Sequence, residues 1–140
     1  MLIHPLSNQL SVAAQIEPAD VAMLAVKGFR GIINNRPDGE EADQPSSAML
    51  AAAATQAGLD YRYIPVVTGQ LQQAHVQAFT SALTDMHAPV LAFCRTGTRS
   101  SILWALQAPG TADAILDSAS AAGYDLSALR PRLGNAARGH

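Results

Sequence analysis

Apolar residues along the chain alternate between short β-branched runs and longer stretches with helical spacing. The short runs predict four strands, at residues 10–14, 30–34, 59–67 and 89–93. Apolar residues that recur every three or four positions predict helices at 18–28, 46–57, 71–87, 100–107, 111–122 and 126–133. Alternating strands and helices indicate an α/β fold in which a mostly parallel central sheet of four to five strands carries helices on both faces.

The length and charge of the chain limit the number of domains and the kinds of partner to expect. A chain of 140 residues suits one domain, so we expect residues 1–140 to form a single unit. Nine basic and eleven acidic residues, dispersed along the chain, argue against a nucleic-acid partner. No apolar stretch is suited to span a bilayer, and the first residues lack the pattern of a signal peptide. We therefore expect a soluble, cytoplasmic protein.

The only cysteine, Cys94, follows the fourth predicted strand directly and stands before a predicted helix. In parallel sheets, ligands bind beyond the carboxyl ends of the strands. A glycine-containing turn at this place should point several backbone N–H groups at the sulfur, and the guanidinium of Arg99 should close the ring. We therefore expect Cys94 and Arg99 to be catalytic, with Cys94 as a thiolate nucleophile at neutral pH. The expected anion-binding residues are Arg95, Thr96, Gly97, Thr98 and Ser100.

Two of these loop residues allow alternative roles. Arg95 could attract an anionic substrate, or it could lie exposed on the rim of the loop. Ser100 could donate a hydrogen bond to the Cys94 sulfur, although capping of the following helix is the default expectation.

A polar loop at residues 36–45 is long for a protein of this class and is a candidate functional segment. Arg36 and Asp38 are its candidate site residues. The alternative, which the sequence favours, is a solvated turn, because Pro-Asp-Gly is a strong turn signal by itself. The four histidines share no metal-binding spacing, so we expect no metal and no cofactor.

The cysteine loop, Cys94-Arg-Thr-Gly-Thr-Arg-Ser100, resembles the active-site loop of the rhodanese sulfurtransferases. A wider set of motifs resembles the phosphatase-like domain of the beta-lactamase hydrolase-like protein family. These motifs are Gln15–Asp20, Asn35–Glu41, Ile64–Val66, Leu103–Leu106 and Ala122–Leu126. The family is similar in fold to the dual-specificity phosphatases, and its domain is sometimes fused to a persulfide dioxygenase. The resemblance implies that the four predicted strands are ordered 1-4-2-3 in the sheet.

Three departures from the phosphatase pattern favour sulfur transfer. Four residues, not five, separate Cys94 from Arg99; Phe93 stands where a histidine is expected; and residues 67–70 lack the general-acid aspartate. We therefore predict a rhodanese-type sulfurtransferase that carries sulfane sulfur as a Cys94 persulfide. Its expected partners are a small anionic sulfur donor, such as thiosulfate or a glutathione persulfide, a thiol or cyanide acceptor, and a persulfide dioxygenase.

Two other functions stay open. The first is a cysteine-based phosphatase that forms a Cys94 phosphoenzyme and takes its acid from Asp38, Glu40 or Glu41 in the long loop. The second is a non-catalytic module that binds anions through the cysteine loop.

Overall fold

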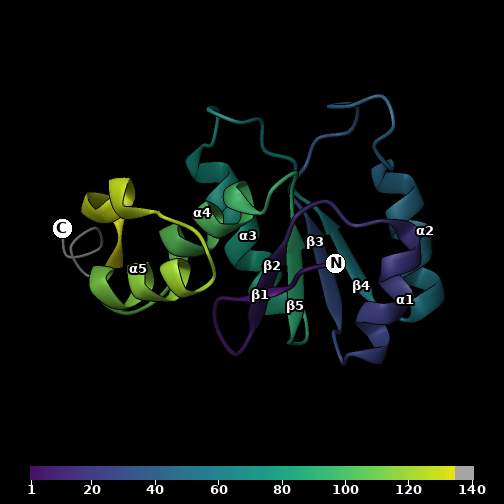
Figure 1. Cartoon of the computed structure of the whole chain (residues 1–140), viewed down its shortest axis with the longest axis horizontal. Helices are drawn as coiled ribbons and strands as arrows, with labels where there is room; N and C mark the ends of the chain where they lie inside the picture. The colour runs from purple at the N-terminus through teal and green to yellow at the C-terminus, as the bar shows by residue number, and fades with distance from the viewer. Residues whose placement is uncertain (135–140) are drawn as a thin grey trace.

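The computed structural model describes residues 1–134, which are built around a five-stranded sheet (Figure 1). The strands are β1 (His4–Pro5), β2 (Leu10–Ala13), β3 (Gly31–Asn34), β4 (Asp60–Tyr63) and β5 (Val90–Phe93). They are ordered β1-β2-β5-β3-β4; the last four are parallel, and β1 is antiparallel to β2. The predicted fold class and the strand order 1-4-2-3 are thereby confirmed. The edge strand β1 was not predicted, because two residues are too few to show a period.

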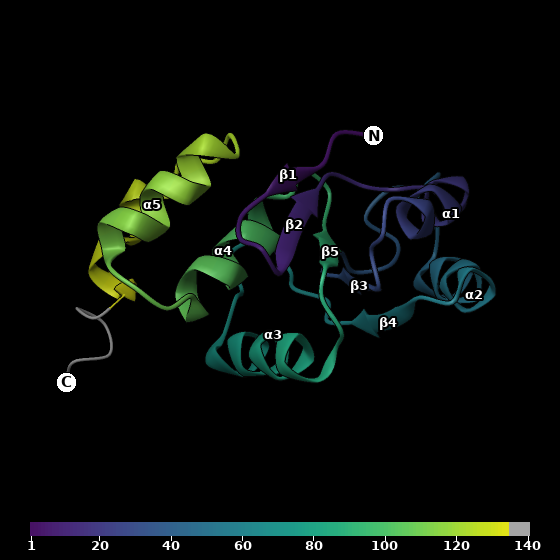
Figure 2. The ribbon, with the colours of Figure 1, turned by 90° about the horizontal axis from the view of Figure 1, so that it is seen from below.

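Helices cover both faces of the sheet (Figures 1 and 2). One face carries α1 (Pro18–Val26) and α2 (Ser47–Ala57), and the other carries α3 (Gln73–Asp85) and α4 (Thr98–Gln107). Beyond α4 lie α5 (Ala112–Ala121) and the 3₁₀-helix η1 (Ser127–Arg132). No helix within residues 1–134 is long and apolar enough to cross a membrane.

Strand β5 shows how the sheet separates two cores. Val90 and Ala92 face the cluster built on α3 and α4, whereas Leu91 and Phe93 face the cluster built on α1 and α2. Successive side chains of a strand point to opposite faces, so a strand covered on both sides is apolar throughout. Because β5 occupies the middle of the sheet, the loop that follows it opens at the centre of the carboxyl edge.

Among the boundaries that differ from the sequence-based expectation, two bear on the site. The strand predicted over 59–67 ends at Tyr63, and Pro65, which has no N–H to donate, follows shortly after. Helix α4 begins at Thr98 instead of Ser100, since Gly97 takes a left-handed conformation with φ 93° and starts the helix early. This early start places Arg99 in the first turn of the helix.

Candidate active site

Three loops meet at the carboxyl edge of the sheet (Figure 1). They follow β3, β4 and β5 and contribute Asn35, Val66 and Cys94 respectively. Backbone hydrogen bonds fasten the loops together: the N–H of Asn35 donates to Phe93 O at 2.8 Å, and the N–H of Val66 donates to Asn35 O at 3.0 Å. The predicted site residues therefore lie on a framework set by neighbouring parallel strands.

Cys94 is buried, with 1% of the residue exposed, and the cysteine loop closes around its sulfur. The backbone N–H of Gly97 donates to Cys94 Sγ at 3.1 Å. Gly97 has a positive φ, and a Cβ at this position would collide with the Tyr124 hydroxyl and lie 3.3 Å from Ala13 O. Glycine is therefore required here both by backbone conformation and by space.

Tyr124 braces the outer side of this loop. Its hydroxyl donates to Thr96 O at 3.1 Å, and its ring packs edge-on against His4 with centroids 5.9 Å apart. Burial raises the pKa of Tyr124, and the negative charge of Cys94 raises it further, which places the phenol within the field of the sulfur. Sequence reasoning missed this residue, because a tyrosine between two short helices carries no local signal of its position.

Arg99 is held by contacts from two other loops. Its Nη1 and Nη2 groups donate to the Glu40 carboxylate at 2.8 and 2.9 Å, and Nη1 also donates to Val66 O at 2.8 Å. The hydrogen bond with Glu40 raises the pKa of Arg99, burial lowers it, and the charge of Cys94 and a hydrogen bond to Cys94 raise it. The guanidinium is therefore close enough to both the Glu40 carboxylate and the Cys94 sulfur to interact with each.

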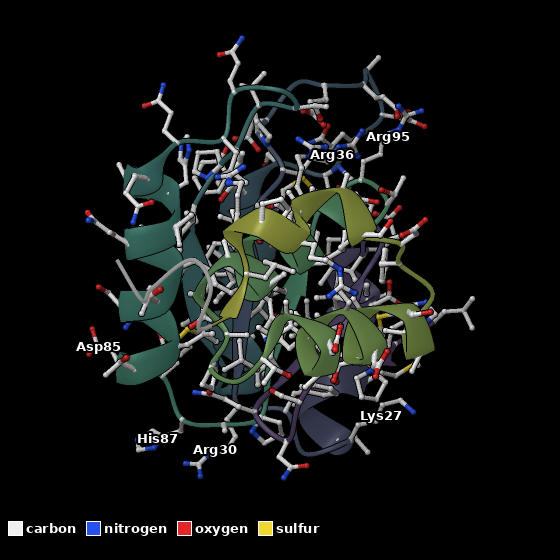
Figure 3. All side chains as sticks on the ribbon, turned by 90° about the vertical axis from the view of Figure 1, so that its left-hand side faces the viewer. Lys27, Arg30, Arg36, Asp85, His87 and Arg95 are labelled. Carbon is white, nitrogen blue, oxygen red and sulfur yellow. The ribbon has the colours of Figure 1, made fainter. Side chains whose placement is uncertain are left out.

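Two further arginines belong to the same charged network. The side chain of Arg36 is only 4% exposed; it donates to Glu40 at 2.8 Å, to Gln15 at 3.0 Å and to Glu41 at 3.0 Å. Arg95 pairs with Glu41 at 3.1 Å, and its side chain is 66% exposed, so it occupies the rim. Figure 3 shows Arg36 and Arg95 at the same end of the molecule.

Residues 38–43 of the long loop form an exposed turn, as we favoured from the sequence, and three of its carboxylates, Asp38, Glu40 and Glu41, bind arginines or backbone. Hydrogen bonds from Arg99, followed by those from Arg36, lower the pKa of Glu40 to about 2 against the opposing effect of burial. Asp38 Oδ1 accepts from the N–H of Ser47 at 2.7 Å, so Asp38 fastens the loop to α2. Glu41 bridges Arg36 and Arg95. An acid from this loop stays a prediction; the low pKa of Glu40 and the hydrogen bonds of Asp38 and Glu41 do not favour it.

The remaining predicted residues have structural roles in the loop. The Ser100 hydroxyl donates to Asn35 Oδ1 at 2.8 Å, and the Asn35 amide donates to Ile64 O at 2.9 Å. Ser100 therefore ties α4 to the loops after β3 and β4, which is neither of its two expected roles. The hydroxyl of Thr96 donates to that of Thr98 at 3.0 Å on the exposed side of the loop.

Comparisons with known proteins agree on one family. The model of the phosphatase-like domain of beta-lactamase hydrolase-like proteins matches residues 3–114. A beta-lactamase hydrolase-like protein of Xylella fastidiosa is 39% identical over 106 residues, which are 76% of this chain and 25% of that protein. The chain spans about a quarter of the length of the curated relatives it matches.

Solved structures give the same result. A candidate phosphatase from Neisseria meningitidis is 38% identical, with a TM-score of 0.83 over 97% of this chain and 99% of the other. The core catalytic domain of a PP-IP phosphatase from S. cerevisiae has a TM-score of 0.68 over 91% of this chain and 80% of the other. At 13% identity, the yeast likeness shows the fold alone.

The sulfurtransferase prediction is wrong, because the matching family and structures are described as phosphatases. The short spacing between Cys94 and Arg99 misled the prediction. Arg99 projects from the first turn of α4 and is held from outside the loop by Glu40 and Val66, so its guanidinium reaches the sulfur with four intervening residues. The sulfur donor, the thiol acceptor and the dioxygenase partner stay predictions of that reading.

Proposed function

Because the chain belongs to the phosphatase-like domain family of the beta-lactamase hydrolase-like proteins, we propose that it is a cysteine-based phosphatase that works through a Cys94 phosphoenzyme. The observation that supports this most strongly is the set of groups gathered at one sulfur. Cys94 Sγ accepts from the N–H of Gly97, and the guanidinium of Arg99 is fixed beside it by Glu40. A buried nucleophile with preorganised donors is the arrangement that phosphoryl transfer requires.

The reaction proceeds in two steps. The Cys94 thiolate attacks phosphorus, an S–P bond forms, and the P–O bond to the leaving group breaks, with both electrons going to the leaving oxygen. Water then attacks the phosphorus, the S–P bond breaks, and its electrons return to sulfur as thiolate, while the water oxygen and protons leave with the phosphate. Throughout, Arg99 and the loop N–H groups bind the phosphoryl oxygens, whose charge they stabilise.

Fixing Arg99 in advance is the contribution of the long loop. An arginine side chain that is free to rotate loses about 2 kcal/mol of rotamer entropy when it binds an anion. Hydrogen bonds to Glu40 and Val66 O fix the Arg99 side chain when the protein folds, so its rotamer entropy is already lost before a phosphoryl group binds. Arg36 in turn holds Glu40 from the buried side.

The test is steady-state hydrolysis of p-nitrophenyl phosphate by the purified chain. We expect phosphate release by the wild type and none by Cys94→Ser, with Ser7→Ala, in the loop before β2, as a folded control that keeps activity. Turnover that survives in Cys94→Ser would contradict the proposed nucleophile. A wild type that binds inorganic phosphate but releases none from any ester would favour the non-catalytic anion-binding alternative.

A further inference from the structure

The site concentrates positive charge but lacks a free proton donor. Three arginines, Arg36, Arg95 and Arg99, are paired with two glutamates, Glu40 and Glu41, which leaves one positive charge in the network. Such a network stabilises an anion in the transition state, yet it cannot protonate a leaving group.

The carboxylates near the sulfur bind arginines or backbone N–H groups. Glu40 has a pKa of about 2, so it is ionised at neutral pH and accepts hydrogen bonds only. Glu41 bridges two arginines, and Asp38 caps the backbone of α2. The segment after Val66, where the resemblance would place the acid, carries Val67, Thr68, Gly69 and Gln70, none of which ionises in the neutral range.

The phenol beside the loop is engaged as well, and the imidazole beside it makes a ring contact with that phenol. The Tyr124 proton is directed at Thr96 O, and burial with the charge of Cys94 raises the pKa of this hydroxyl. The His4 ring packs against Tyr124, and within residues 1–134 no hydrogen bond joins its imidazole to the cysteine loop. The described site therefore holds no acid that is both neutral and directed at the sulfur.

From this geometry, and resting on the proposed function, we propose that the substrate is a phosphoryl compound whose leaving group departs as a stable anion: an acyl phosphate or a phosphoanhydride. A carboxylate has a pKa of about 4, and a phosphate monoester has a second pKa of about 6, so neither needs a proton to leave. An alkoxide does, and the lack of a general acid costs a factor of about 10²–10⁴.

The rim of the site also suits such a leaving group. The Arg95 side chain is 66% exposed and, within residues 1–134, pairs with Glu41, so its guanidinium is accessible to a departing carboxylate or phosphate. In the first step, the S–P bond forms, the P–O bond breaks, and the leaving oxygen keeps the electron pair without gaining a proton. Water completes the second step as in the proposed function.

The experiment compares leaving groups on the intact chain. We expect kcat/KM to fall steeply across a series of aryl phosphates as the phenol becomes less acidic, and acetyl phosphate or pyrophosphate to react at least 10²-fold faster than an alkyl phosphate. The steep dependence should persist in His4→Gln and Tyr124→Phe. The relative rates with acetyl phosphate and pyrophosphate distinguish an acyl phosphate from a phosphoanhydride.

A shallow dependence in the wild type, or alkyl phosphates turned over as fast as acetyl phosphate, would overturn the inference while the phosphatase itself stands. A shallow dependence that becomes steep in His4→Gln or Tyr124→Phe would overturn it by identifying the acid. If no compound of the series is hydrolysed, the proposed function fails together with the inference.

Discussion

At the scale of the residue, the site depends on how one guanidinium is held. Arg99 makes two hydrogen bonds to Glu40 and one to Val66 O while it faces the sulfur, and only a planar fork reaches all of these partners. We expect Arg99→Lys to lower kcat/KM by about 10²–10³-fold, although it keeps the charge. The matched control is Arg130→Lys, which alters an exposed pair with Asp113 and should leave turnover unchanged. Near wild-type activity in Arg99→Lys would remove Arg99 from the site.

The pairing of Glu40 with Arg99 makes the stability of the protein depend on pH. Its pKa is about 2 in the folded protein and 4.5 without the fold, so its pairing with Arg99 and Arg36 stabilises the protein above about pH 4.5 and is lost as the pH falls toward 2. We expect Glu40→Gln to lower the free energy of unfolding by roughly 0.5–1.5 kcal/mol at neutral pH, because solvent screens part of the pairing of this exposed residue. Urea unfolding at several pH values should show that this difference shrinks with acidification. A constant difference, or one as large in the exposed control Asp117→Asn, would contradict the assignment.

At the scale of the element, the cysteine loop depends on Gly97 at the start of α4. An alanine there would combine a positive φ with a collision against Tyr124, whereas Gly28, with φ 97°, has open space around it. We expect Gly28→Ala to cost about 1–2 kcal/mol of stability through the backbone alone and to keep activity. Gly97→Ala should cost more and lose most of its phosphatase activity. Equal effects of the two substitutions on turnover would show that the loop does not need this geometry.

The sequence patterns predicted the helices and strands because these elements depend on residues close together in the chain. The strand after Pro89, the helix end at Gly58 and the nucleophile at the strand end all follow from residues within a few positions of one another. The contact between Glu40 and Arg99 joins residues 59 positions apart, and that between Tyr124 and Thr96 joins residues 28 apart. No periodicity records such pairs, which is why neither the contact of the long loop with Arg99 nor the place of Tyr124 was predicted.

At the scale of the whole molecule, two cores hold the sheet and thereby the three loops. Leu103 of α4 is fully buried in the core shared with α3, so its truncation weakens the support of the cysteine loop. We expect Leu103→Ala to lower the free energy of unfolding by about 2–5 kcal/mol, measured by urea denaturation. Val26→Ala on α1, where the side chain is 89% exposed, is the control and should change stability by less than about 0.5 kcal/mol. Comparable losses in both variants would contradict this description of the core.

The central claim is that phosphate passes through the Cys94 sulfur, and trapping that intermediate tests it most directly. The chain is mixed with p-nitrophenyl phosphate, denatured during turnover, and its intact mass and peptides are measured. The account predicts that the wild type gains one phosphoryl group on the peptide that contains Cys94, while Cys94→Ser gains none. Turnover with Cys94 unmodified, or with the phosphoryl group on another residue, would contradict it.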